Sequence, residues 1–235
     1  MNKTLTILST RELGETLVEK IISRDIIFDQ VPFIEMTQRC SEALQKQLRE
    51  LAALPLLVIF TSRVAVASVV SMLDEKPDHW NIACMGGATR KAAAGFFGEK
   101  QIAVTAANSK ELAERLAAMP QTNEWFFFCG NRRMNDLPET LQLDNKHFTE
   151  LVVYDTTETP SAISQSYDAV LFFSPSAAES FFSVNSVPAS TILFSIGETT
   201  AITLRRLCNN PVVVSAVHSP EVLLDTMFHY FATEA

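Results

Sequence analysis

The chain alternates short apolar runs with segments in which apolar residues recur every three to four positions. Runs such as Leu56 to Phe60 and Val170 to Phe173 have the length of buried strands. Leu44, Leu48 and Leu51 recur at helical spacing and predict one face of an amphipathic helix. Strands that alternate with helices are typical of parallel sheets covered by helices on both faces. We therefore expect an α/β fold.

The remaining elements follow from the same two patterns. Further strands are expected at 5–8, 26–34, 101–104, 124–129, 148–156 and 192–194. Pro32 interrupts the second of these runs, so that part is expected at a sheet edge or in a connection. The polar tract from Asp155 to Pro160 predicts a connector, and Ser109 and Ser219 are expected to cap helices.

The second half of the chain repeats the first. In both halves an apolar run ends in a turn of hydroxyl residues or glycine, and a helical pattern follows. The matching positions are Ser62 and Ser174, Gly86 and Gly197, and Ser109 and Ser219, which lie 112, 111 and 110 positions apart. A repeat of this length is a whole half of a protein rather than a solenoid unit, so we expect two similar lobes, flavodoxin-like in architecture.

Two β-rich segments lie outside the alternating pattern, at 31–36 and 151–157. If they pair antiparallel, they form a two-stranded ladder that joins the lobes. One lobe then combines residues 1–35 with 158–235 and is discontinuous in sequence. The other lobe contains residues 36–150, and residues 151–157 form the returning strand.

Composition restricts the class of protein. With 235 residues, 47% of them hydrophobic, the chain is long enough for two folded lobes. Its net charge of −8, with 19 basic residues among 27 acidic ones, argues against a nucleic-acid surface. The four cysteines are isolated, so we expect neither disulfides nor a zinc site, and a reducing cytoplasm fits best. A signal peptide and a membrane-spanning run are not expected either.

The turns after the strands are the candidate chemical sites. Parallel α/β folds bind ligands at the carboxyl ends of their strands, and helix N-termini there attract anions. The turns at Ser174 and Gly197 have this composition. Helix capping alone explains such turns equally well, so at this level both interpretations stay open.

Six short signatures, taken in order, resemble one known family. They are Phe60-Thr61-Ser62, Gly86-Gly87-Ala88-Thr89, Cys129-Gly130-Asn131, Val153-Tyr154-Asp155-Thr156, Phe173-Ser174-Pro175-Ser176 and Ile196-Gly197-Glu198-Thr199-Thr200. Their order and spacing resemble the uroporphyrinogen-III synthase family over nearly the whole chain. The resemblance implies two α/β lobes joined by a two-stranded ladder, with the active site in the cleft between them. It implies a cofactor-free closure of the linear tetrapyrrole hydroxymethylbilane, with inversion of ring D.

The resemblance also assigns residues. Tyr154 matches a tyrosine that assists loss of the substrate hydroxyl. The expected substrate-binding residues are Thr61, Ser62, Gly86, Thr89, Gly130, Asn131, Arg132, Ser174, Gly197, Thr199 and Thr200. The family often places an arginine where this chain has Met134, so Arg132 or Arg133 takes that place. The expected partners are the substrate and hydroxymethylbilane synthase, and the expected state is a monomer.

Two other classes remain alternatives on sequence grounds. A non-catalytic two-lobe module that binds a small anion has the same general architecture. A flavodoxin-like flavin carrier is a third interpretation. The chain contains no Gly-x-Gly-x-x-Gly motif and no Walker loop, which weakens nucleotide-binding interpretations.

Overall fold

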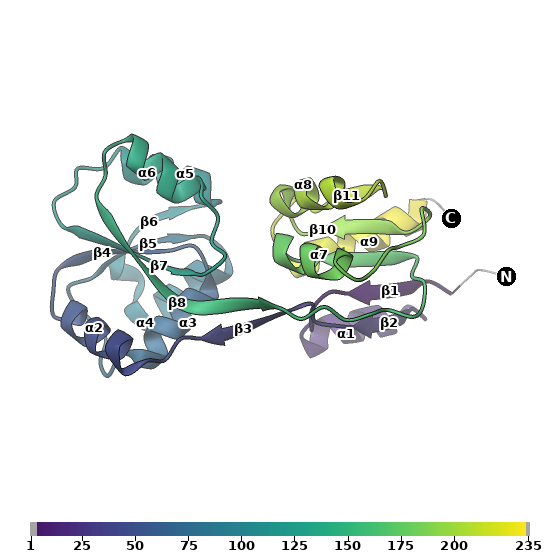
Figure 1. Ribbon diagram of the computed structural model, residues 1–235, viewed down its shortest axis with the longest axis horizontal. Helices are drawn as coiled ribbons and strands as arrows, with labels where there is room; N and C mark the ends of the chain where they lie inside the picture. The colour runs from purple at the N-terminus through teal and green to yellow at the C-terminus, as the bar shows by residue number, and fades with distance from the viewer. Residues whose placement is uncertain (1–3, 234–235) are drawn as a thin grey trace. The chain divides into compact units, whose positions relative to one another are not determined.

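The computed structural model describes residues 4–233. The chain divides into two compact units, and each contains one sheet with helices around it (Figure 1). Unit 1 consists of Met1–Glu35 and Thr157–Ala235, and unit 2 of Met36–Thr156. The expected α/β fold class is confirmed, because each unit contains a parallel set of strands that is covered by helices.

Unit 2 is built on strands that run parallel in the order β8-β7-β4-β5-β6. Their bounds are β4 (Leu56–Phe60), β5 (Asn81–Met85), β6 (Ile102–Ala106), β7 (Glu124–Gly130) and β8 (Phe148–Glu158). The helices are α2 (Glu42–Ala52), α3 (Arg63–Met72), α4 (Ala88–Phe97), α5 (Ser109–Ala117) and α6 (Asp136–Leu143), with a short 3-10 turn η1 (Glu99–Gln101).

The sheet of unit 2 is buried on both faces. Helices α2, α3 and α4 pack on one face, and α5 and α6 pack on the other (Figure 1). All five residues of β4 are buried as a result, which is why this strand reads as a continuous apolar run rather than an alternating one. The aromatic rings of Phe60, Trp80 and Phe128 stack in the apolar core between the sheet and helices α2, α3 and α4.

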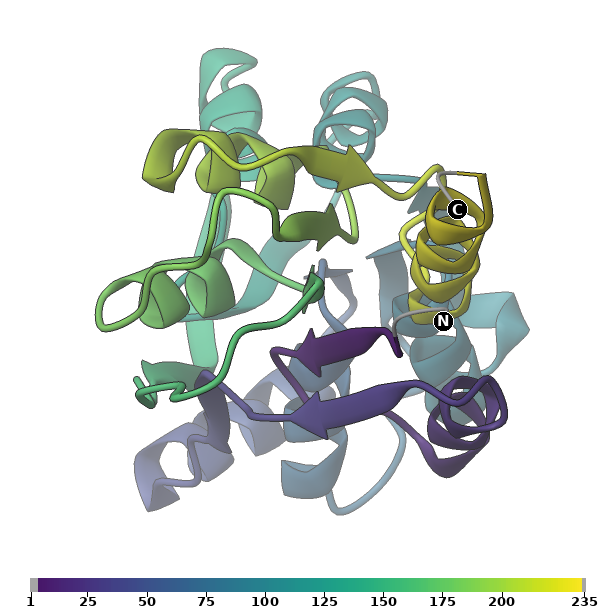
Figure 2. The same ribbon diagram turned by 90° about the vertical axis from the view of Figure 1, so that its right-hand side faces the viewer.

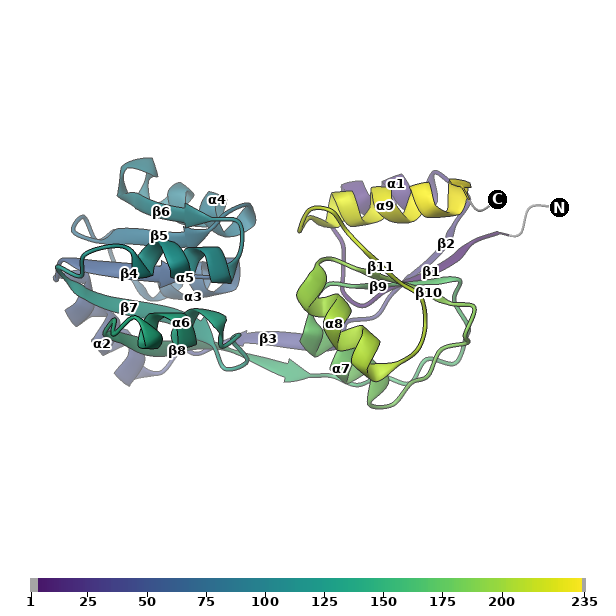
Figure 3. The same ribbon diagram turned by 90° about the horizontal axis from the view of Figure 1, so that it is seen from above.

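Unit 1 takes its strands from both ends of the chain. The parallel order is β11-β10-β9-β1-β2. The strands are β1 (Thr6–Ser9), β2 (Ile27–Gln30), β9 (Ala169–Phe172), β10 (Ile192–Ser195) and β11 (Val212–Val214). The helices are α1 (Glu15–Ile22), α7 (Pro175–Phe182), α8 (Glu198–Leu207) and α9 (Pro220–Thr233). Helices α1 and α9 cover one face, and α7 and α8 cover the other (Figures 2 and 3).

The two units have the same strand order. Counted from β4 in unit 2 and from β9 in unit 1, the order is 3-2-1-4-5, and in unit 1 the N-terminal strands β1 and β2 supply positions 4 and 5. This refines the expectation of flavodoxin-like halves, since the flavodoxin order is 2-1-3-4-5. The N-cap of α5 lies one residue before the expected position. Asn108, not Ser109, caps α5, because its side chain accepts the N–H of Glu111 at 2.9 Å.

Strand β3 (Ile34–Gln38) pairs with β8 and forms the ladder through which the chain leaves and re-enters unit 1. The N–H of Arg39 donates to Val153 O, and the N–H of Thr159 donates to Phe33 O, so the two strands run antiparallel. The side chain of Arg39 also donates to both carboxylate oxygens of Asp155, at 2.7 and 2.8 Å. The polar tract expected to be a connector therefore lies partly in β8, which extends to Glu158.

In the part of the chain that the structure describes, none of the helices is both long enough and apolar enough to cross a membrane.

Candidate functional site

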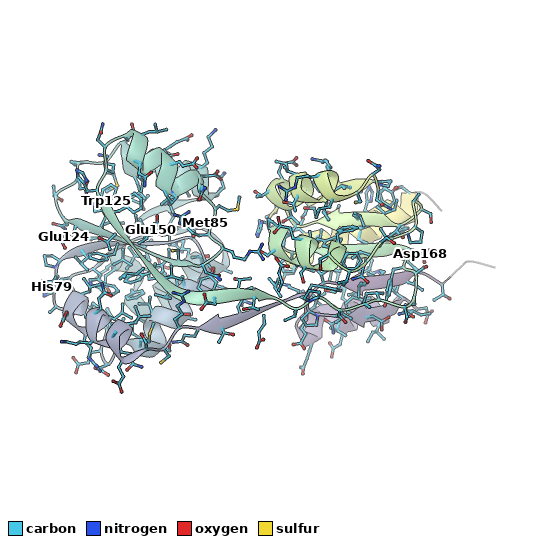
Figure 4. All side chains as sticks on the ribbon, in the orientation of Figure 1. His79, Met85, Glu124, Trp125, Glu150 and Asp168 are labelled. Carbon is cyan, nitrogen blue, oxygen red and sulfur yellow. The ribbon has the colours of Figure 1, made fainter. Side chains whose placement is uncertain are left out.

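The expected site residues of unit 2 follow the strands, so they lie at one edge of the sheet. In Figure 4 Met85, the last residue of β5, marks this carboxyl edge, and Glu124, the first residue of β7, lies at the opposite edge. Thr61 and Ser62 follow β4, and Asn131 follows β7. A cavity of about 250 Å³ beside Asn81 and Trp125 lies at the amino edge, away from these residues.

Tyr154 lies on β8 directly beside the end of β7. It pairs with Gly130 in the sheet register, at a point where the register shifts. A Cβ atom at Gly130 would lie 2.5 Å from Tyr154 Cζ and 2.8 Å from its hydroxyl oxygen. The ring also packs against the apolar core that contains Phe128 and Phe60. Position 130 therefore has to be glycine if the ring is to occupy this place.

Ser62 follows β4 at the same edge of the sheet. Its Oγ caps α3 by accepting the N–H of Val64 at 3.1 Å. Burial raises the pKa of the Tyr154 phenol, the side chain of Ser62 lowers it, and the charge of an ionised Cys129 raises it. The net shift is upward, so the phenol is a protonated hydrogen-bond donor at neutral pH.

The loop after β7 is held to β8 by Asn131. Its backbone N–H donates to Tyr154 O at 3.2 Å, and its side-chain oxygen accepts the N–H of Thr156 at 2.8 Å. The amide of Asn131 thus continues the pairing of the two strands, although the residue is exposed. These bonds fix the loop close to Tyr154.

The two arginines of this loop differ in their surroundings. Arg133 donates from Nε to Glu150 Oε2 at 2.6 Å and from Nη2 to Glu150 Oε1 at 2.8 Å, and Glu150 on β8 is labelled in Figure 4. This bond raises the pKa of Arg133. Arg132 has an exposed side chain, and Met134 is about half exposed. The guanidinium of Arg133 is therefore bound by the carboxylate of Glu150 within unit 2.

The turn between β5 and α4 consists of two glycines, so it presents backbone rather than side chains. The N–H of Gly86 donates to Ala106 O at 2.8 Å, and a Cβ at this residue would lie 3.4 Å from that oxygen. Gly87, the N-cap of α4, has a φ of 63°, which favours glycine. Thr89 is only 7% exposed. The exposed part of this turn is thus glycine backbone, while the side chain of Thr89 is buried.

Unit 1 presents a similar edge. Ser174 caps α7, because its Oγ accepts the N–H of Ala177 at 3.1 Å, and Gly197 is the N-cap of α8. Thr199 is exposed in the first turn of α8. Its neighbour Thr200 is only 3% exposed, like Thr89 at the matching position of unit 2. The structure thus leaves Ser174, Gly197 and Thr199 accessible and buries Thr200.

Two basic residues at this edge escaped the sequence analysis. Arg11 follows β1, and its guanidinium lies 4.3 Å from the centre of the Phe173 ring. His218 follows β11, and its Nδ1 is 3.1 Å from the position that a Cβ on Gly197 would take. Although His218 is exposed overall, burial of part of its ring lowers its pKa, and the charge of Arg11 lowers it further. Ligands of parallel α/β folds bind at the carboxyl ends of the strands, and this rule would have identified both residues if it had been applied to β1 and β11.

The chemistry at each edge is that of hydrogen-bond donation. The edge of unit 2 offers the N-termini of α3 and α4, the protonated phenol of Tyr154 and the side chain of Arg132. The edge of unit 1 offers the N-termini of α7 and α8 and the side chains of Arg11 and His218. Helix N-termini and arginines bind carboxylates and phosphates. Within residues 4–233, no group of three or more His, Cys, Asp or Glu residues is placed to hold a metal ion.

Comparison with solved structures shows which proteins share this fold. The chain resembles uroporphyrinogen-III synthetase from Helicobacter pylori 26695, with a TM-score of 0.68 and 16% identity, covering 97% of this chain and 100% of that one. It also resembles a mutant uroporphyrinogen III synthase from the extremely thermophilic bacterium Thermus thermophilus, with a TM-score of 0.65 and 17% identity over 97% and 98% of the two chains. At these identities the likeness shows a shared fold.

Comparison at the level of sequence gives the family. None of the curated protein sequences matches this chain. The sequence model of uroporphyrinogen-III synthase HemD, however, matches residues 15–225, which include all of unit 2, most of unit 1 and every expected site residue. The chain therefore belongs to the uroporphyrinogen-III synthase family.

Proposed function

We propose that the chain closes hydroxymethylbilane to uroporphyrinogen III with Tyr154 as the proton donor to the departing hydroxyl. Family membership over residues 15–225 supports the overall reaction. The observation that carries the role of Tyr154 is its phenol, kept protonated and held against Gly130 at the carboxyl edge of unit 2.

The first step needs only modest help from the protein. The lone pair of the terminal pyrrole nitrogen expels the hydroxyl, which leaves as water once it has taken a proton, and an azafulvene forms. The azafulvene is attacked by the substituted carbon of ring D, and the resulting spiro intermediate fragments and recloses with ring D inverted. Without the enzyme the same substrate closes without inversion, so control of its conformation decides the product.

Proton donation fits the environment of Tyr154. A phenol with a raised pKa stays protonated across the neutral range and donates without competing ionisation. Its burial against the core also restricts the position of the ring. A positioned acid contributes roughly 10²–10⁴-fold to a rate, and we expect the low end or less here because the pyrrole nitrogen already drives departure.

Binding is assigned to the carboxyl edge of each unit. We propose that the acetate and propionate groups of the substrate are bound by Arg132 and the N-terminus of α3 in unit 2. In unit 1 the proposed contacts are Ser174, Thr199 and the pair Arg11 and His218. Each carboxylate at a helix N-terminus gains about 0.3–1 kcal/mol from the dipole, in addition to its hydrogen bonds. Many such contacts allow an acidic protein to hold a polyanion.

The setting of the reaction is also a proposal. We expect the chain to act as a monomer in the cytoplasm, where its four free cysteines stay reduced. Direct transfer of the substrate from hydroxymethylbilane synthase would shorten the time in which it closes unaided in water. That enzyme is therefore the expected partner.

The test supplies hydroxymethylbilane and separates the isomers of the product. The wild-type chain is expected to yield type III, and Tyr154→Phe is expected to yield the same isomer at a rate lowered by about tenfold to a hundredfold. Only type I product at high enzyme concentration would remove the proposed activity. Full turnover of Tyr154→Phe at saturating substrate would remove only the role of Tyr154.

A further inference from the structure

We propose that Asn131 is a positioning residue for Tyr154 rather than a substrate-binding residue. Its side chain holds the backbone of β8 just after the tyrosine, at a point where the backbone of β7 no longer does so. In this way it fixes the direction in which the phenol projects. The inference rests on the proposed role of Tyr154 and specifies how the strand that carries the phenol is held.

The side chain of Asn131 replaces a missing piece of strand β7. That strand ends at Gly130, and the chain then turns, with the N–H of Arg133 donating to Gly130 O at 3.2 Å. In a parallel ladder a residue donates its N–H to one residue of the next strand, and its carbonyl accepts from the residue two positions later. Asn131 makes the first bond with its backbone, to Tyr154 O at 3.2 Å. Its side chain makes the second, because Oδ1 accepts the N–H of Thr156 at 2.8 Å.

The amide of Asn131 bonds to Thr156 through both of its polar atoms. Besides the bond at Oδ1, its Nδ2 donates to Thr156 O at the longer distance of 3.4 Å. Two bonds to the same residue set the orientation of the amide. Although Asn131 is exposed, a substrate group would have to compete with the backbone of Thr156 for this amide.

Three successive peptide groups around Tyr154 are held by hydrogen bonds. Val153 O accepts the N–H of Arg39 at 2.9 Å, Tyr154 O accepts the N–H of Asn131, and the N–H of Thr156 donates to Asn131 Oδ1. These bonds reach β8 from both sides, because Arg39 follows β3 and Asn131 follows β7. The backbone on either side of a residue determines the direction of its Cβ, so these bonds set where the phenol ring projects.

The pairing of β7 with β8 is irregular directly before this point. Its register shifts between Cys129 and Gly130, where Gly130 pairs with Tyr154. The ring then occupies the place of a Cβ at position 130, which would lie 2.5 Å from Tyr154 Cζ. A slip of β8 by one residue would move the ring to the other face of the sheet. The bonds of Asn131 follow the irregularity at once and maintain the register that places the ring against Gly130.

Hydrogen exchange at the backbone N–H of Thr156 tests the contact without using activity. In Asn131→Ala this N–H loses its acceptor, and its exchange in the native chain, followed by NMR, is expected to become about tenfold faster. Asn131→Asp keeps an oxygen at the place of Oδ1, so the exchange should return close to the wild-type rate. Unchanged exchange in Asn131→Ala overturns the proposal.

Kinetics then separate positioning from substrate binding. Asn131→Ala is expected to lower kcat about threefold to tenfold with little change in KM, because the phenol is displaced while the carboxylate contacts remain. In a Tyr154→Phe background the same change should have no further effect on kcat. A raised KM in Asn131→Ala, or a loss of kcat that persists in that background, means that Asn131 contacts the substrate itself and overturns the proposal.

Asn131→Asp adds a rescue to the kinetic test. It should recover most of kcat, because the bond to the N–H of Thr156 is restored. Its added charge should raise KM for a substrate that carries carboxylates, so the rescue is read in kcat alone. A kcat in Asn131→Asp as low as that of Asn131→Ala, with the exchange at Thr156 restored, would overturn the proposal.

The ring signals of Tyr154 distinguish failure of this inference from failure of the proposed function. The chain has three tyrosines, and in NMR spectra the signal of Tyr154 is the one that disappears in Tyr154→Phe. The ring signal should shift in Asn131→Ala, and an unchanged signal overturns the proposal. If the signal shifts but Tyr154→Phe keeps full turnover, Asn131 still positions the ring, and it is the proposed function of Tyr154 that fails.

Asn185→Ala is the matched control for loss of an asparagine that bridges backbone groups. In unit 1 its Oδ1 accepts the N–H of Ile163 at 2.8 Å, and its Nδ2 donates to Ser161 O at 2.8 Å. It follows α7, at the end of that helix away from the carboxyl edge of the sheet. Its removal should lower the melting temperature, with no effect on kcat or on exchange at Thr156. A similar fall in kcat in this control would mean that the effect of Asn131→Ala comes from stability alone, and would overturn the proposal.

Discussion

The ring of Tyr154 occupies the place that a side chain at Gly130 would need. A Cβ at that position would lie 2.5 and 2.6 Å from two ring carbons, closer than such atoms approach in proteins. Among the described glycines, those with a positive φ are Gly87 and Gly98, so the backbone at Gly130 does not itself demand glycine. The requirement at 130 comes from Tyr154.

Gly130→Ala is therefore expected to lower both stability and activity. The added methyl forces the ring out of this place or displaces β7, and overpacking of this kind costs about 1–3 kcal/mol. Thermal melts and the rate of type III formation measure the two effects. Gly95→Ala is the matched control, because nothing lies within 4 Å of a Cβ there and the residue is inside α4. That variant should be more stable by about 0.5–1 kcal/mol. Normal kcat in Gly130→Ala would show that the ring does not need this place.

The dependence of turnover on Tyr154 should persist to high pH. Its folded-state pKa is raised above the ordinary value of 10, so the donor form is present below that pH and is lost only as pH rises through the folded pKa. The stability linked to this group has the same sign and is also lost only in alkali. The ratio of kcat between wild type and Tyr154→Phe should stay constant from about pH 7 to about pH 10. A ratio that falls to one near pH 8 would contradict this expectation.

The loop arginines should separate into a structural and a binding residue. Arg133 and Glu150 are 25% and 28% exposed and share two hydrogen bonds, so Arg133→Ala should lower the free energy of unfolding by about 1–3 kcal/mol with little change in KM. Arg132→Ala should raise KM, because its side chain is exposed beside the proposed carboxylate site. Denaturant unfolding and steady-state kinetics measure the two. The opposite pattern would assign binding to Arg133.

The thiols should differ in reactivity by location. Burial raises the pKa of Cys84 and of Cys129 to about 11, so few thiolates form there at pH 8. Cys40 is exposed and Cys208 is partly exposed. Iodoacetamide at pH 8 should label Cys40 first and Cys208 next, and should reach Cys84 and Cys129 only after unfolding. Peptide mass spectrometry follows this order, and early labelling of Cys129 in the native chain would disprove it.

Residues 36–156 are expected to fold as a fragment, whereas residues 158–235 are not. Strand β9 pairs with β1, and Ile7 and Leu8 of β1 are fully buried, so the C-terminal fragment lacks the two strands β1 and β2 that complete one side of its sheet. Circular dichroism melts of the two fragments measure this. Adding a peptide of residues 1–35 to the C-terminal fragment should restore a cooperative transition. A cooperative melt of 158–235 alone would count against the assignment.

The sequence could predict those parts of the site that depend on neighbouring residues. Ser41, Ser62 and Ser174 each precede a helix, and each caps it in the structure, because capping is decided within four residues. At Asn108 and Ser109 two suitable cap residues are adjacent, and the expectation of Ser109 was wrong because the pattern alone does not distinguish them.

Features set by distant contacts could not be read in this way. Thr199 and Thr200 are neighbours in a helix, but only Thr200 is buried against the sheet of unit 1. Where that sheet lies relative to the helix depends on residues far away in the sequence, so the local pattern does not reveal which threonine is buried. The tract from Asp155 to Glu158 is polar, yet it forms strand because β3 supplies hydrogen-bonding partners. Arg11 and His218 are far apart in sequence and share an edge only because β1 joins the C-terminal strands.

The placement of β1 between β2 and β9 also has a consequence during synthesis of the chain. Ile7 and Leu8 emerge from the ribosome before β9, and their partners on that strand are made more than 150 residues later. At about 5–20 residues per second, the N-terminal segment waits for roughly ten to thirty seconds with its apolar side chains uncovered. The residues of unit 2 are complete in that interval. A stop codon after unit 2 would therefore leave an N-terminal segment that is permanently without its sheet, a substrate for chaperones and proteases.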